Sequence, residues 1–203
     1  MMETILWDYP KSSASYRVRI ALNLAGIHYR TQPVDLLAGA HKTPDYIACN
    51  PQGLVPVLEI DGQRFTQSLA ILEYLDATRD LGLLPTALAW RARVQAAAYC
   101  IAIDLHPVCN LSVMRHATGG QEPARTEWMQ HFIRPGLVAF EQMLADLAAD
   151  GCPTVQTPLL TDLCLIPQLY NARRWGVIYD DLKRIMDIEA RCAADPAFVD
   201  AAP

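Results

Sequence analysis

Residues 11–22 read Lys-Ser-Ser-Ala-Ser-Tyr-Arg-Val-Arg-Ile-Ala-Leu, and this stretch is the most informative in the chain. Ser12 and Ser13 carry hydroxyl groups of the kind that cap the start of a helix. Four apolar residues then recur at the helical spacing i, i+3, i+4, i+7. They are Val18, Ala21, Leu22 and Ala25. The pattern predicts an amphipathic helix that begins after the serines and ends at Gly26.

The segments on either side of this helix have the composition of β-strands. Residues 4–7 form a short β-prone run before it, and residues 28–34 form another after it. Further on, Asp61 and Gly62 form a strong hairpin signal between two strand-like runs, and another amphipathic helix follows them. The alternation of strands and helices predicts an α/β domain over residues 1–80.

The second half of the chain has helical patterns throughout. A short linker at residues 81–85 separates it from the α/β part, so residues 86–203 are expected to form an all-α domain. Pro107 is expected to kink or break the first helix of this domain, because proline lacks a backbone N–H. The predicted helices cover residues 90–103, 122–149, 160–174 and 181–194.

Composition and charge narrow the classes of function. The 203 residues include 17 Lys and Arg against 22 Asp and Glu, which gives a formal net charge of −5. A chain without a basic region is not expected to bind nucleic acid or an anionic membrane surface. Residues 46–58 are uncharged, but two prolines and a glycine interrupt them, so no membrane span is expected there.

The cysteines indicate a cellular compartment and do not indicate a metal site. Six of them are widely spaced, and the first residues lack the pattern of a signal peptide, so we expect free thiols in the cytoplasm. Cys100, His106 and Cys109 are the nearest approach to a metal-ligand cluster. They lack the paired Cys-x-x-Cys spacing of zinc sites, so no metal site is expected.

Residues 11–22 resemble the signature R-S-S-C-S-W-R-V-R-I-A-L of the zeta-class glutathione transferases, whose best-known members are maleylacetoacetate and maleylpyruvate isomerases. The resemblance covers nearly the whole chain. Four further segments support it in the order of the family: residues 50–56, 67–71, 110–113 and 162–168. The resemblance implies a thioredoxin-like N-terminal domain, an all-helical C-terminal domain and a homodimer.

Ser12 is the first candidate for stabilising the glutathione thiolate, and Ser13 is the second. A free thiol ionises near pH 8.5, so a site that uses the thiolate must favour the anion. A serine hydroxyl can donate a hydrogen bond to the sulfur, and the N–H groups and positive dipole end of a helix act in the same direction. A serine at this position can equally serve as a helix cap alone.

Further contacts with glutathione follow from the resemblance. Gln67 and Ser68, at a predicted helix start, would hold the α-amino acid end of the tripeptide, although Ser68 could also act as a cap. The Val55 backbone would pair with glutathione like an added strand, and its bond to Pro56 would be cis. The other predicted contacts are Ser15, His41, His106, Asn110 and Ser112.

Cationic residues are the candidates for binding the carboxylates of a small anionic substrate. The resemblance gives this role to Lys11, Arg17, Arg173 and Arg174, and it places Arg17 and Arg174 in the catalytic site as well. Arg173 and Arg174 end a predicted helix, where the dipole alone favours cations, so a structural role stays open. For His106 the open alternative is a cap at the Pro107 kink, and for His41 it is a surface position.

Several positions depart from the family pattern, among them Tyr16 in place of Trp and Thr154-Val155 in place of Gly-Asp. Ala14 stands where the family has Cys, which removes a thiol that could assist reactivity, and Lys11 replaces Arg, which loses the two-pronged geometry of the guanidinium. Leu159 replaces a capping Ser or Thr, while Asp162 is retained. Thr157, followed by proline at the first helical position, is expected to provide a shifted cap.

The resemblance implies a glutathione-dependent cis–trans isomerase of a small diketo acid, maleylacetoacetate or maleylpyruvate. The thiolate would add to the cis double bond, the resulting single bond would rotate, and elimination would release the trans isomer and glutathione. One alternative is a general transferase that attaches glutathione to halogenated acids or other electrophiles. Another is a non-catalytic protein with the same fold. Product analysis separates the two enzymes, because only a transferase accumulates a conjugate.

Overall fold

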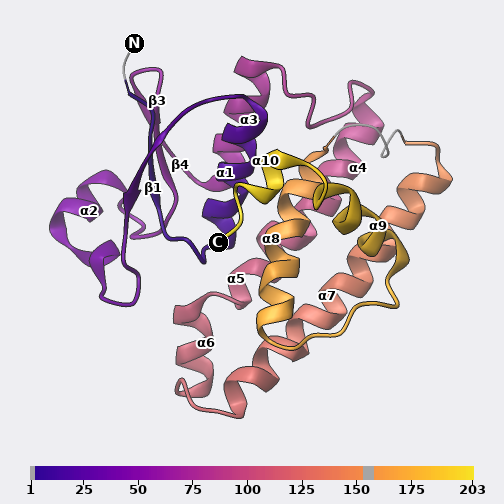
Figure 1. Cartoon of the computed structure of the whole chain (residues 1–203). Helices are drawn as coiled ribbons and strands as arrows, with labels where there is room; N and C mark the ends of the chain where they lie inside the picture. The colour runs from indigo at the N-terminus through magenta and orange to yellow at the C-terminus, as the bar shows by residue number, and fades with distance from the viewer. Residues whose placement is uncertain (1–2, 153–157) are drawn as a thin grey trace. The chain divides into compact units, whose positions relative to one another are not determined.

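The computed structural model describes residues 3–152 and 158–203. The chain divides into two compact units (Figure 1). The first unit runs to Leu81 and also contains Asp195–Pro203, and the second unit is Gly82–Ala194. The predicted division assigned residues 86–203 to one domain, whereas the structure groups the last nine of them with the first unit.

The described part of the first unit contains a four-stranded sheet in the order β2-β1-β3-β4. β1 and β2 are parallel, and the pairs β1–β3 and β3–β4 are antiparallel. α1 and α3 lie on one side of this sheet and α2 on the other (Figure 1). The strands are β1 (Ile5–Asp8), β2 (Arg30–Pro33), β3 (Val57–Ile60) and β4 (Gln63–Thr66), and the helices are α1 (Ser13–Leu24), η1 (Ala40–Lys42, a 3-10 turn), α2 (Pro44–Cys49), α3 (Ser68–Arg79) and α10 (Pro196–Val199).

Local sequence explains the two elements that matter most for the site. Ser12 is the N-cap of α1, and Gly26 after its end has a φ of 63°, as the serine and glycine signals predict. The β3–β4 hairpin turns at Asp61 and Gly62, whose φ values of 53° and 73° are those of a type I′ turn. The α/β fold class predicted for this part of the chain is confirmed.

The C-terminal segment is held to α1 by hydrogen bonds that local sequence does not reveal. The Tyr16 hydroxyl donates to the Phe198 carbonyl at 3.3 Å, and the Arg19 guanidinium donates to the Ala201 carbonyl at 2.7 Å. Arg19 also forms a buried ion pair with Asp8 at 2.8 Å. These contacts explain why residues 195–203 belong to the first unit.

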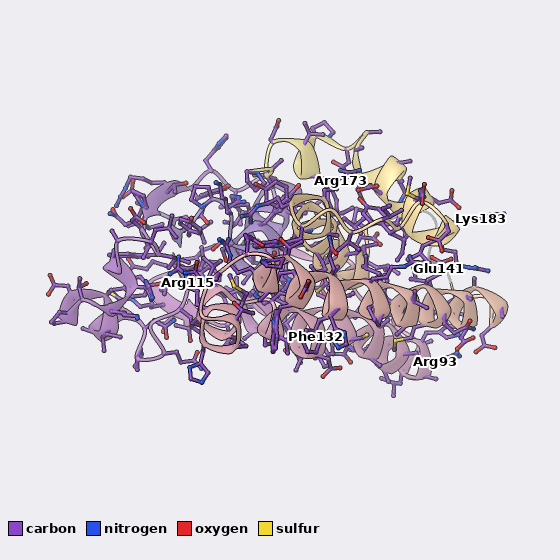
Figure 2. All side chains as sticks on the ribbon, turned by 90° about the horizontal axis from the view of Figure 1, so that it is seen from below. Arg93, Arg115, Phe132, Glu141, Arg173 and Lys183 are labelled. Atoms are coloured by element: carbon purple, nitrogen blue, oxygen red, sulfur yellow. The ribbon has the colours of Figure 1, made fainter. Side chains whose placement is uncertain are left out.

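The described part of the second unit is helical, as predicted. Its α7 is the long helix that crosses Figure 2, and α8 is largely buried. No single helix in the described ranges has both the length and the apolar character to cross a membrane, although Leu88–Val108 and Leu111–Thr118, bent by 45°, have them as a pair. The helices are α4 (Leu88–Tyr99), the π-helical η2 (Cys100–Leu105), α5 (His106–Val108), α6 (Leu111–Thr118), α7 (Ala124–Ala149), α8 (Leu160–Arg174) and α9 (Lys183–Cys192).

The predicted break at Pro107 takes the form of a π-helical segment just before it. The N–H of His106 bonds to the carbonyl of Ile101, five residues back. Proline cannot donate to the carbonyl four residues before it, and its ring crowds that carbonyl. The wider π turn relieves this conflict, and such turns are frequent at functional sites.

α8 begins without the Ser or Thr cap of the family pattern. Asp162 lies in its first turn, and its carboxylate accepts a hydrogen bond from the Leu159 N–H at 3.1 Å. Arg191 of α9 pairs with the same carboxylate at 2.7 Å. The expected cap at Thr157 lies outside the described residues.

Candidate functional site

Three segments of the first unit meet at one end of the sheet. Trp7 of β1 is paired with Val57 of β3, and Val57 is paired with Thr66 of β4. The loop to α1 leaves the sheet after Asp8, the Val55-Pro56 bond comes just before Val57, and α3 starts at Ser68, two residues after Thr66. The strand register therefore brings the start of α1, the Val55-Pro56 bond and the start of α3 to the same end of the sheet.

The start of α1 offers donors and no negative charge. The Ser12 Oγ accepts a hydrogen bond from the Ser15 N–H at 3.2 Å, so its own O–H remains able to donate. Ser13, the first helical residue, is buried, and the first turn contains no Asp or Glu. The cap and the thiolate interpretations are thus compatible, because one oxygen can accept from the helix while its proton points to an anion.

The Val55-Pro56 peptide bond is cis, as the resemblance implies. Two side chains hold the loop that precedes it. The Tyr46 hydroxyl and the Asn50 amide each donate to the Leu54 carbonyl at 2.7 Å, and Asn50 is buried. These two hydrogen bonds were not predicted from the sequence, although the Asn-Pro-x-Gly pattern at residues 50–53 indicates a turn there.

Gln67 and Ser68 form an unusual helix start. Gln67 has a φ of 67°, a conformation that side chains other than glycine rarely adopt and that is found most often at functional sites. Its amide donates to the Gln52 side chain at 2.6 Å, and it provides no side-chain cap to α3. Ser68 is buried, and its Oγ accepts a hydrogen bond from the Arg17 guanidinium at 3.1 Å.

Two predicted contact residues point into the interior. Arg17 is 1% exposed, and this placement does not support the expected contact with a substrate carboxylate. Ser15 is fully buried, and its Oγ has no hydrogen bond within the residues that the structure describes. The spacing of a helix start does not show which side chains turn inward, so local sequence does not separate these two residues from Ser12.

His41 and Lys11 are nearer the surface of the first unit. His41 lies in η1, and its carbonyl oxygen would be 3.1 Å from a Cβ placed on Gly53, so η1 approaches the loop before Pro56 closely. Burial and the neighbouring Lys42 lower the pKa of the His41 imidazole, which favours the neutral form. Lys11 is exposed and makes no ion pair with the part of the chain described.

The remaining predicted site residues lie in the second unit. His106 is half-buried at the start of α5, Asn110 is the N-cap residue of α6, and Ser112 is exposed in its first turn. No group of three or more His, Cys, Asp or Glu side chains suited to a metal is present among residues 3–152 and 158–203. A hollow of about 490 Å³ between α6 and α7 is lined in part by Trp128 and Phe132, and none of the predicted site residues is among its lining residues. Phe132 is labelled in Figure 2.

The two adjacent arginines at the end of α8 differ in their partners. Arg173, labelled in Figure 2, pairs with Glu189 at 2.7 Å, and Glu189 also accepts from the Tyr179 hydroxyl at 3.0 Å. Arg174 lies over the Tyr170 ring, with its guanidinium carbon 5.7 Å from the ring centre. No ion pair of Arg174 occurs among the described residues. Arg174 is therefore the better placed of the two to bind an external carboxylate.

Comparison with known proteins agrees with this arrangement. Residues 2–77 match the family described as glutathione S-transferase, N-terminal domain. The chain is 56% identical to the maleylacetoacetate isomerase of Rhizobium meliloti, over 99% of this chain and 96% of that protein. Two solved structures are also similar over nearly their whole length.

The first is the holo structure of maleyl pyruvate isomerase, a bacterial glutathione S-transferase of the zeta class. It has a TM-score of 0.89 and 36% identity, covering 98% of this chain and 96% of that chain. The second is a maleylacetoacetate isomerase from Methylobacterium extorquens with bound malonate and glutathione. It has a TM-score of 0.89 and 34% identity, covering 98% of this chain and 99% of that chain.

Proposed function

The chain belongs to the zeta-class glutathione transferases, and from this premise we propose that it is a glutathione-dependent cis–trans isomerase of a small diketo acid, maleylacetoacetate or maleylpyruvate. The proposal rests mainly on one observation: the start of α1, the cis Val55-Pro56 bond and the start of α3 come together at the same end of the sheet.

The residues at this edge fit glutathione. Ser12 has an O–H to donate beside a helix start without acidic residues, and Ser68 offers a second hydroxyl at the start of α3. The Val55 backbone, just before β3, is suited to pairing with an extended peptide. Together these groups suit a peptide with a sulfur anion in the middle and a carboxylate at one end.

Bound glutathione supplies a sulfur nucleophile that is regained at the end of the cycle. Ser12 keeps that sulfur ionised by donating a hydrogen bond from its hydroxyl group to the sulfur, and the positive end of α1 adds to the effect. The Ser12 hydroxyl must stay neutral and oriented, and the Ser15 N–H orients it by bonding to its oxygen. Ser13 is the second donor at the same helix start.

Binding of the anionic substrate falls to cations with no carboxylate partner of their own. Arg174 and Lys11 meet this condition among the described residues, whereas Glu189 already engages Arg173. His106, Asn110 and Ser112 complete the proposed contacts from the second unit. Residues 1–80 would then hold glutathione, the helical part from residue 86 to Ala194 would shape the substrate site, and the protein would act as a cytoplasmic homodimer. All six cysteines lie within the described ranges, and each is a free thiol there.

An assay with two substrates tests the proposal. Purified protein is incubated with maleylacetoacetate and, separately, with maleylpyruvate, each with and without glutathione. We expect the trans product from at least one substrate, formed only with glutathione and with all glutathione recovered. Accumulation of a glutathione conjugate would instead identify a transferase, and loss of neither substrate would refute the isomerase.

The adjacent arginines provide a matched pair for the substrate site. Arg174→Met is expected to raise KM for the diketo acid about tenfold, since it removes a charged hydrogen-bond donor. Arg173→Met should leave KM nearly unchanged, because Glu189 engages that guanidinium in the wild type. Equal effects of the two substitutions would remove Arg174 from the proposed site.

A further inference from the structure

Arg17 is one of the large side chains that are almost completely buried in the structure. It is 1% exposed, and it lies on α1 of the first unit. Its Nη1 atom donates a hydrogen bond to the Oγ of Ser68, 51 residues further along, at 3.1 Å. A buried guanidinium is costly unless it is hydrogen-bonded, and the bond to Ser68 is one of the contacts that hold Arg17 in the interior.

The direction of this hydrogen bond is not free. A guanidinium has five N–H donors and no acceptor, and it does not lose its proton in proteins. The Ser68 oxygen must therefore be the acceptor. A serine hydroxyl has a single proton, and that proton cannot go to Arg17, so it must be donated elsewhere. Because Arg17 bonds to the Ser68 oxygen, the Ser68 O–H group is left to donate to another acceptor.

The start of α3 determines what this donor can meet. Ser68 is the first residue of α3, and Gln67 before it supplies no side-chain cap. The first N–H groups of a helix lack partners within the helix and favour a negative charge. A carboxylate placed there would accept from the Ser68 hydroxyl and from these N–H groups, and the Arg17 charge behind Ser68 would attract it as well.

We propose that Arg17 is a positioning residue for glutathione: it holds the Ser68 hydroxyl as a donor to the carboxylate at the γ-glutamyl end of the tripeptide. The inference rests on the proposed function only in that glutathione is the ligand. In place of the expected direct contact with the substrate carboxylate, Arg17 acts on glutathione, and it does so indirectly through Ser68. Arg17 therefore affects glutathione affinity and leaves the chemistry at the sulfur unchanged.

Calorimetric titration with glutathione tests this role in four proteins: wild type, Arg17→Met, Ser68→Ala and the double variant. Methionine keeps the volume of the stem and removes the donors. We expect Arg17→Met to weaken glutathione binding about tenfold, the size expected for a hydrogen bond to a charged group. In the Ser68→Ala background the same substitution should have almost no further effect, because its target is gone. Additive losses would overturn the proposal.

Arg19 offers a matched control on the same helix. It is also buried, but its guanidinium bonds to Asp8 and to the Ala201 carbonyl, away from Ser68. Arg19→Met should lower the melting temperature and leave the glutathione affinity of the folded protein unchanged. If Arg17→Met does not fold, Arg17→Lys replaces it, since lysine keeps the charge and one donor and should retain part of the affinity.

A ligand variant separates a positioning effect from general damage to the site. Glutathione amidated at the γ-glutamyl α-carboxyl group should bind wild type and Arg17→Met alike, whereas native glutathione should distinguish them. An equal loss of affinity for native and amidated glutathione would overturn the proposal.

Steady-state kinetics provides a second readout. Arg17→Met should raise KM for glutathione and leave kcat unchanged, and a fall in kcat would overturn the proposal. If wild type binds glutathione but forms no isomer, the proposed function fails and this inference stands. If wild type does not bind glutathione, both fail.

Discussion

α1 in the first unit and α8 in the second are both largely buried helices, but their first turns are completed in opposite ways. At α8 the chain supplies its own carboxylate: Asp162 accepts from the Leu159 N–H and pairs with Arg191. At α1 the cap is the neutral Ser12, and no acidic residue follows in the first turn. A helix start closed by an internal anion serves stability, whereas one left without an anion can receive a ligand.

The largest expected effect comes from opening the closed helix start. Asp162→Ala removes the acceptor of the Leu159 N–H and the partner of Arg191, and we expect the free energy of unfolding to fall by about 3 kcal/mol. Urea unfolding followed by circular dichroism measures this. Glu59→Ala, which breaks the exposed Arg64–Glu59 pair, should cost less than about 1 kcal/mol. Equal losses would contradict a special role for Asp162.

Removing the donor at the open helix start should affect turnover more than binding. Ser12→Ala is expected to lower kcat about 100-fold, by analogy with the loss of one donor to a developing anion, and to cost about 1 kcal/mol of stability as a lost cap. Initial rates and a melting curve measure the two effects. Ser12→Thr keeps a hydroxyl and should retain most of the turnover. Unchanged turnover in Ser12→Ala would move the role to Ser13 or another donor.

Closing the open helix start with a charge tests the comparison directly. Ser12→Asp should cap α1 about as well as serine does, with a change in stability below about 1 kcal/mol, because both residues are good N-caps. The new carboxylate would occupy the place of the ligand anion, so we expect glutathione affinity to fall at least about tenfold. Ser12→Asn, a neutral cap of similar shape, is the control for charge. Normal affinity in Ser12→Asp would disprove an anion site at α1.

The smallest expected effect is a pH dependence of the closed helix start. Burial raises the pKa of Asp162 from 3.8 to about 6, although Arg191 and the Leu159 N–H lower it. The folded chain then binds more protons than the unfolded chain between these values, so this group makes the free energy of unfolding fall as the pH rises from about 4 to about 6. Asp162→Asn should remove that slope in urea unfolding.

A second carboxyl provides the sign control for this measurement. The hydrogen bond and the charge of Arg134 lower the pKa of Asp181, so its contribution to stability is present above the pKa of the unfolded chain and is lost as the pH falls. Asp181→Asn should therefore remove a slope of opposite sign. The same slope change in both variants would show that Asp162 does not titrate as described.

Patterns of neighbouring residues were sufficient to predict much of the fold and part of the site. The serines before a 3.6-residue stripe predicted α1 and its cap, and Asp61 and Gly62 predicted the β3–β4 turn. The resemblance to the zeta class predicted the cis bond before Pro56, which the structure confirms. The first two features depend only on the residues next to them in the chain, whereas the cis bond was predicted from the resemblance alone.

Contacts between residues far apart in the chain could not be predicted in this way. The break before Pro107 was expected, but its π-helical form was not. The acidic cap of α8 depends on Arg191, 29 residues away. The last nine residues return to α1 through the Arg19 and Tyr16 bonds, which a reading of helices in chain order places in the second unit.

Residues 11–22 show most clearly which features follow from local sequence and which depend on tertiary contacts. By itself the sequence determined that they start a helix with hydroxyl groups at its positive end, because capping and periodicity act within one or two turns. Only the tertiary structure decided that Arg17 turns inward to Ser68 and Arg19 to Asp8 and Ala201, two residues apart on the same helix. The physical reason is that a guanidinium takes its direction from acceptors that other parts of the chain bring to it, and those parts meet only when the sheet has formed.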